Sequence, residues 1–131
     1  MKVKYLKEWI CKAEQDYHTI LLLSRERKNL LPDIICFHAQ QCVEKYLKSL
    51  LVKHGLKVPK THNLIYLKEQ LIKYEPELEF EEDILRDLNQ YAVEFRYPGE
   101  MATKREAREA IKKANKLRKI FLDKLLRLSK K

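Results

Sequence analysis

The sequence predicts an all-α fold, a single domain over residues 1–131 in which four to five helices form an antiparallel, up-and-down bundle. Only 2 glycines and 4 prolines occur, which is too few for the frequent turns of an all-β protein. Residues that favour helices dominate the composition, chiefly Leu, Lys, Glu, Arg and Ala. Hydrophobic residues make up 45% of the chain, so it can build a core.

Apolar residues recur every three or four positions through five segments, which is the spacing of one helical face. We expect helices over residues 3–26, 32–54, 62–74, 81–96 and 103–129. Pro32 suits the first turn of the second helix, and Gly55 is the expected glycine just after its end. Thr61 is expected to cap the third helix, whereas Thr103 and Glu106 form a predicted capping box at the start of the last.

Charge is spread unevenly along the chain, although the total is +9. Residues 103–131 contain 12 basic and 3 acidic side chains, a net charge of +9, and residues 75–94 contain 8 acidic side chains and one basic, a net charge of −7. A basic end can attract nucleic acid through counterion release, and it can equally be a lysine-rich solvated surface.

The cysteines and the apolar runs indicate a cytoplasmic protein. Cys11, Cys36 and Cys42 contain no CxxC pair, so we expect reduced thiols. The chain has no apolar run long enough for a membrane span, and its N-terminus does not resemble a signal peptide.

His38 and Cys42 lie four residues apart, but two ligands are fewer than a zinc site needs. We therefore expect no metal and no other cofactor.

A stripe of hydrogen-bond donors lies on the second expected helix, on the side opposite its apolar face. Its members are His38, Gln41, Lys45 and Lys48. Donors at this spacing are suited to phosphate groups or base edges. The same pattern fits a solvated surface or a polar helix contact in a dimer, and the stripe alone leaves these possibilities open.

Arg96 lies at the expected end of the fourth helix, just before Pro98. One role is structural, because a cation in the last turn of a helix interacts favourably with the helix dipole by about 0.3–1 kcal/mol. Another role is recognition, because Tyr91 and Tyr97 offer aromatic faces beside the guanidinium for bases and phosphate. No glycine-rich phosphate loop accompanies these residues.

Three segments, in this order, resemble the HEPN family of small prokaryotic helical domains: FHAQQCVEKYLKSLLVKHG, PKTHNL and YAVEFRYPG. The resemblance runs from Trp9 to the last helix, which is essentially the whole chain. It implies a helical bundle that commonly forms a homodimer, binds nucleotide or RNA, and acts beside a separate minimal nucleotidyltransferase, in some cases as toxin and antitoxin. The residues that we expect to bind nucleotide or RNA are His38, Gln41, Lys45, Lys48, His62, Tyr91, Arg96 and Tyr97.

Toxic members of the family are metal-independent ribonucleases, in which an arginine and a histidine are separated by four to six residues. The histidine moves protons and the arginine stabilises phosphoryl charge. Arg96 matches the arginine, but the positions for the histidine are Met101, Ala102 and Thr103. We therefore expect a nucleotide- or RNA-binding accessory subunit rather than an enzyme. The alternatives are a ribonuclease with a displaced histidine, in which Arg96 is catalytic, and a purely structural dimeric scaffold.

Overall fold

The computed structural model describes residues 2–26, 30–93 and 98–129. These residues form five α-helices, two short 3-10 helices and no strand, so the predicted all-α bundle is confirmed. The helices are α1 (Lys2–Ser24), α2 (Pro32–Lys53), α3 (Leu64–Leu71), α4 (Glu82–Asn89) and α5 (Lys104–Ser129), and the 3-10 helices are η1 (Pro76–Glu81) and η2 (Gln90–Ala92).

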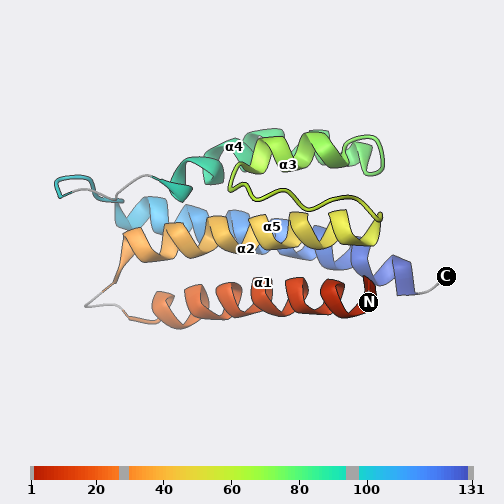
Figure 1. Ribbon diagram of the computed structural model, residues 1–131. Coiled ribbons are helices and arrows are strands. Elements are labelled where there is room, and N and C mark those ends of the chain that lie inside the picture. Colours follow the sequence, from red (N-terminus) through yellow and green to blue (C-terminus); the bar gives the residue numbers. More distant parts are fainter. Residues whose placement is uncertain (1, 27–29, 94–97, 130–131) are drawn as a thin grey trace.

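α2 is the central element of the bundle (Figure 1). α1 runs antiparallel along one side of it, α5 runs beside it in the same direction as α2, and the pair α3–α4 covers a further side. Of the 22 residues of α2, 13 are buried. Polar side chains on this helix must therefore find partners inside the protein, because an unpaired buried polar group is costly.

The segment between α2 and α3 returns along α2 from its C-terminal end toward its middle (Figure 1). Gln40 in α2 donates its amide N–H to the carbonyl oxygen of His62 at 2.8 Å, which places the end of this segment against the helix. As a result α3 runs parallel to α2. The alternation of directions that the sequence predicts holds for α1–α2 and for α3–α4, with this one parallel step between them.

The glycine that the sequence indicates lies just after the end of α2. Gly55 has φ 71°, a left-handed conformation that favours glycine. Its N–H donates to the carbonyl of Val52 at 3.0 Å, and the N–H of Leu56 donates to Leu51 at 2.9 Å. This pair of bonds is the Schellman motif, and it turns the chain into the returning segment.

The predicted capping box at the start of α5 is confirmed. The N–H of Glu106 donates to Thr103 Oγ1, and the N–H of Thr103 donates to Glu106 Oε1, both at 3.0 Å. Nearby, the N–H of Ala102 donates to Asp33 Oδ1 at 2.6 Å. This second bond joins the beginning of α5 to the first turn of α2, so the two parallel helices start side by side.

The predicted limits of the third helix were wrong at both ends. α3 begins at Leu64, and its cap is Asn63 rather than Thr61, because Asn63 Oδ1 accepts the N–H groups of Ile65 and Tyr66. The helix ends at Leu71, where a turn leads directly into the proline that opens η1.

The fourth helix is also shorter than predicted. α4 ends at Asn89, whose side-chain oxygen accepts the N–H of Leu64 at 2.7 Å and thereby joins the end of α4 to the start of α3. The tighter turn of η2 follows and places Tyr91 and Ala92 in the core, where they are 7% and 9% exposed. The last part of the predicted helix, residues 94–96, lies outside the described residues.

Candidate functional site

The carboxylate of Asp16 on α1 receives two of the predicted donors of α2. His38 Nδ1 lies 2.8 Å from Asp16 Oδ1, and Lys45 Nζ donates to Asp16 Oδ2. Asp16 itself is 7% exposed, whereas the side chains of His38 and Lys45 keep 30% and 22% of their surface in contact with solvent. Since His38 and Lys45 are two helical turns apart, the single carboxylate between them sets how α1 lies against α2.

The same contacts determine the ionisation of Asp16. Burial alone would raise its pKa, but the hydrogen bonds and charges of His38 and Lys45 outweigh burial, and the pKa of Asp16 is lowered from its ordinary value. The carboxylate therefore stays ionised at neutral pH and remains an acceptor for both donors.

Glu44 is a second internal acceptor, and it is 3% exposed. It accepts from Lys48 Nζ at 3.0 Å and from Gln41 Nε2 at 3.3 Å, and its Oε1 lies 2.9 Å from His62 Nδ1. The ammonium of Lys48 also lies 5.5 Å from the centre of the Trp9 ring, a favourable cation–π position. Lys48 is only 6% exposed, so its charge is used inside the protein.

Two neighbouring glutamines complete this network. Gln41 Nε2 donates to Gln40 Oε1 at 2.7 Å, and Gln40 is fully buried and holds the backbone of His62. The side chain of His62 is nevertheless 68% exposed. The network thus fixes the returning segment on α2 and leaves one imidazole at the surface.

A third carboxylate, Glu14 on α1, joins α1, α2 and α5. Arg118 of α5 donates two parallel hydrogen bonds to it, both at 2.7 Å, and the hydroxyl of Tyr46 in α2 also donates to it. The hydrogen bond from Arg118 is the main reason that the pKa of Glu14 is lowered. Burial, together with this bond to Glu14, raises the pKa of Tyr46. The guanidinium of Arg118 lies 4.4 Å from the ring centre of Tyr17, which adds a cation–π contact.

The remaining predicted site residues are Tyr91, Arg96 and Tyr97. Tyr91 lies in η2 and is 7% exposed, while Arg96 and Tyr97 lie outside the described residues. The three positions where the ribonuclease motif has its histidine have other roles. Met101 is 74% exposed, Ala102 is bound through its N–H to α2, and Thr103 caps α5. None of these side chains is a titratable acid or base.

Within the described residues, no group of three or more His, Cys, Asp or Glu side chains could hold a metal ion. Cys42 is fully buried, and burial raises the pKa of its thiol, while His38 binds Asp16. None of the described helices combines the length and the apolar character that crossing a membrane requires.

The sequence predicted the donors but missed their acceptors. Asp16 lies three residues after Ala13 and four before Ile20, which both face the core. This spacing places Asp16 on the buried face of α1, and it could have indicated an internal acceptor. Glu44 lies four residues before Lys48, the spacing of a helical ion pair. Glu14 gave no comparable signal, because its partner Arg118 is 104 residues away along the chain.

Comparison with known proteins identifies what the chain resembles. Residues 6–125 match the family model described as the HEPN domain. A protein of Methanocaldococcus jannaschii, named "Putative toxin MJ1304", is 31% identical over 138 aligned positions, which cover 92% of this chain and 88% of that protein. No solved structure matches the chain significantly.

Replacing Asp16 with Asn should lower the free energy of unfolding by ~1.5–3 kcal/mol, because the ionised acceptor of His38 and Lys45 is lost in a largely buried place. Asp87→Asn is a matched control, since Asp87 pairs with Lys113 at 2.9 Å but is 52% exposed, and it should cost less than ~1 kcal/mol. Urea denaturation of both variants measures the difference. Equal effects would show that Asp16 does not join α1 to α2.

Acid should remove the contribution of Asp16. Its folded-state pKa lies below its unfolded value, so the stabilisation is complete above the unfolded pKa of about 3.9 and is lost as the pH falls through the folded pKa. The difference in unfolding free energy between the wild type and Asp16→Asn should therefore be constant near neutral pH and shrink as the pH falls below about 5. Denaturant titrations at several pH values measure it, and a constant difference would contradict the lowered pKa.

Proposed function

This chain belongs to the HEPN domain family, and on that premise we propose that it is a nucleotide- or RNA-binding accessory subunit that acts with a separate nucleotidyltransferase. The match over residues 6–125 carries the proposal. The chain is similar to a protein named as a toxin, which fits a toxin–antitoxin context. In that context this chain and the nucleotidyltransferase form the pair.

The charge of α5 supports a polyanionic ligand. Four exposed cations of this helix have no ion pair within the described residues: Lys104, Arg105, Arg108 and Lys119. Cations without internal partners can neutralise phosphates and release counterions, which is the usual source of affinity for nucleic acid.

A metal-independent ribonuclease is the second candidate, and one contact favours it. A carboxylate that binds an imidazole orients the ring for proton transfer, as Asp16 does for His38, and the His38 side chain is 30% exposed. Against it, the family's histidine position after Arg96 holds Met101, Ala102 and Thr103. We therefore place this activity second.

We also propose that the protein acts as a homodimer through an apolar surface at the start of α2. Leu31, Ile34 and Phe37 are 44%, 43% and 39% exposed. Leu31 and Ile34 also line a hollow of about 240 Å³ together with Met101, which is 74% exposed. Neighbouring apolar side chains of this size are typical of protein contact sites rather than of surfaces facing water.

The purified protein should bind nucleotide or RNA, retain a nucleotidyltransferase from a lysate of its source cells, and leave RNA intact in the absence of metal. Filter binding, mass spectrometry of the retained proteins and denaturing gels measure these three results. Failure of all binding, with no nucleotidyltransferase retained, would overturn the proposal.

Metal-free cleavage that is lost in both His38→Ala and Arg96→Ala, and kept in His18→Ala at an exposed position of α1, would establish the ribonuclease instead.

Light scattering should give the mass of a dimer for the wild type and of a monomer for Ile34→Lys, since a buried ammonium disfavours the apolar contact. Phe80→Lys is the control, because Phe80 is 86% exposed on η1 and belongs to another surface, and this variant should remain dimeric. A monomeric wild type, or a dimer that Ile34→Lys leaves unchanged, would contradict this contact.

A further inference from the structure

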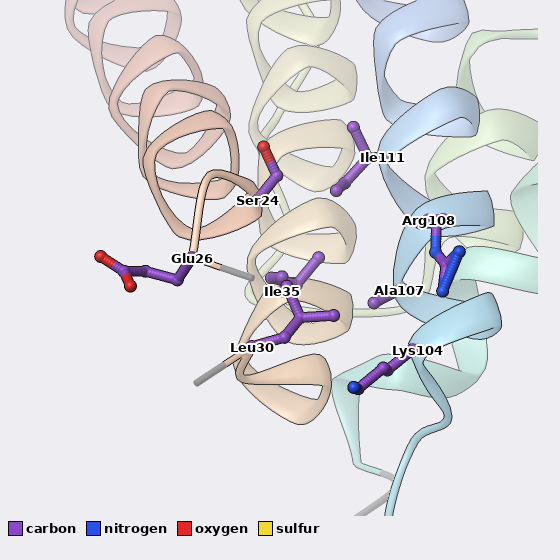
Figure 2. A pocket seen from close by; sticks show the side chains of 8 residues that line it. All are labelled: Ser24, Glu26, Leu30, Ile35, Lys104, Ala107, Arg108 and Ile111. Atoms are coloured by element: carbon purple, nitrogen blue, oxygen red, sulfur yellow. The ribbon is translucent and has the colours of Figure 1, made fainter. Parts of the chain in front are cut away.

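A cavity of about 340 Å³ lies where the end of α1 meets the beginnings of α2 and α5 (Figure 2). This volume falls within the range of roughly 300–1,000 Å³ that small-molecule sites occupy. Four apolar side chains and four polar ones line it: Leu30, Ile35, Ala107 and Ile111, and Ser24, Glu26, Lys104 and Arg108. The cavity therefore combines an apolar surface with a charged rim.

The charged rim is set by Lys104 and Arg108, one helical turn apart on α5. Neither forms an ion pair within the described residues. Glu26 is the one carboxylate among the lining residues, and in Figure 2 it points away from α5. The net character of the rim beside the apolar surface is thus positive.

Carboxylates on adjoining turns make other contacts and form no ion pair with these two cations among the described residues. Asp33 accepts the N–H of Ala102, and Glu106 accepts the N–H of Thr103 in the capping box. Glu109 lies 3.8 Å from Lys112. Lys104 is also the first residue of a 26-residue helix, whose N-terminal end adds partial positive charge.

We propose that this cavity binds a nucleoside monophosphate, with the phosphate at Lys104 and Arg108 and the nucleoside against the partly buried side chains of Leu30 and Ile111. The inference rests on the proposed function, because it assigns a place to the nucleotide. Arginine can donate two parallel hydrogen bonds to a phosphate, and lysine adds a point charge beside it. Ser24, on the opposite wall, donates its hydroxyl proton to the carbonyl of Leu21 at 2.7 Å, and its oxygen can still accept a hydrogen bond from the ligand.

The donor stripe of α2 is less suited to the phosphate. His38 and Lys45 both bind Asp16, and Lys48 binds Glu44. A phosphate placed there would compete with an ionised carboxylate for each donor and would be repelled by it. At Lys104 and Arg108 no such competition exists among the described residues, so the phosphate gains its contacts without breaking others.

Calorimetric titration tests the proposal on the intact chain with the four common nucleoside monophosphates, the matching nucleosides and inorganic phosphate. At least one monophosphate should bind, and its nucleoside and inorganic phosphate should each bind at least about tenfold more weakly, since each lacks one half of the contacts. Equal affinity for the monophosphate and its nucleoside would overturn the role of the cations.

The variant Lys104→Ala/Arg108→Ala should bind the monophosphate at least about tenfold more weakly than the wild type. Lys112→Ala/Arg127→Ala removes the same charge from the same helix at exposed positions that do not line the cavity, and it should bind within about twofold of the wild type. Ser24→Trp, which fills the cavity without a change of charge, should also weaken binding. Circular dichroism establishes that each variant is folded.

The outcomes separate this inference from the proposed function. If the wild type binds nucleotide and both Lys104→Ala/Arg108→Ala and Ser24→Trp bind it equally well, the cavity is not the site, and the proposed function stands. The same conclusion follows if the wild type binds RNA but no monophosphate. If the wild type binds neither nucleotide nor RNA, both the proposed function and the assignment of this cavity are overturned.

Discussion

The burial of α2 among the other helices is the constraint on which the rest of the structure depends. With 13 of its 22 residues buried, the helix has too little surface to leave its polar side chains in water. Acceptors must come from inside the bundle, and three carboxylates supply them. Asp16 and Glu14 reach α2 from α1, and Glu44 lies on α2 itself.

These carboxylates also give the bundle its specific arrangement. A carboxylate bound between His38 and Lys45 requires one position of α1 along α2, which adds to the fit of the packed apolar side chains. Glu14 extends the same requirement to α5 through Arg118. The polar interior therefore specifies how three helices pack, and the apolar core supplies most of the driving force.

Much of the fold could be predicted from the sequence, because helix periodicity and capping are local. The start of α2 at Pro32, its end at Gly55 and the capping box of Thr103 and Glu106 all depend on residues within one or two turns. The choice of Asn63 over Thr61 as a cap was not predictable in this way. It depends on the position of the returning segment, which Gln40 holds from the middle of α2.

The candidate site was less predictable for the same reason. The donor stripe was visible at helical spacing, but whether its donors face solvent or carboxylates depends on pairs such as Asp16 with Lys45, 29 residues apart. The segments that carry the family resemblance, FHAQQCVEKYLKSLLVKHG and PKTHNL, contain the members of the Glu44 network. Their pattern thus describes an internal framework at least as much as a ligand site. Arg96 and Tyr97, the other part of the resemblance, lie outside the described residues.

The polar face of α2 thus acts as an internal framework, and we assign phosphate recognition to the cations at the start of α5. Two-dimensional NMR of the amide signals during titration with a nucleoside monophosphate tests both statements at once. We predict that the largest shifts occur at Ser24, Lys104 and Arg108, while His38, Lys45 and Lys48 keep their signals. Shifts centred on His38 and Lys45, with Lys104 and Arg108 unchanged, would contradict both.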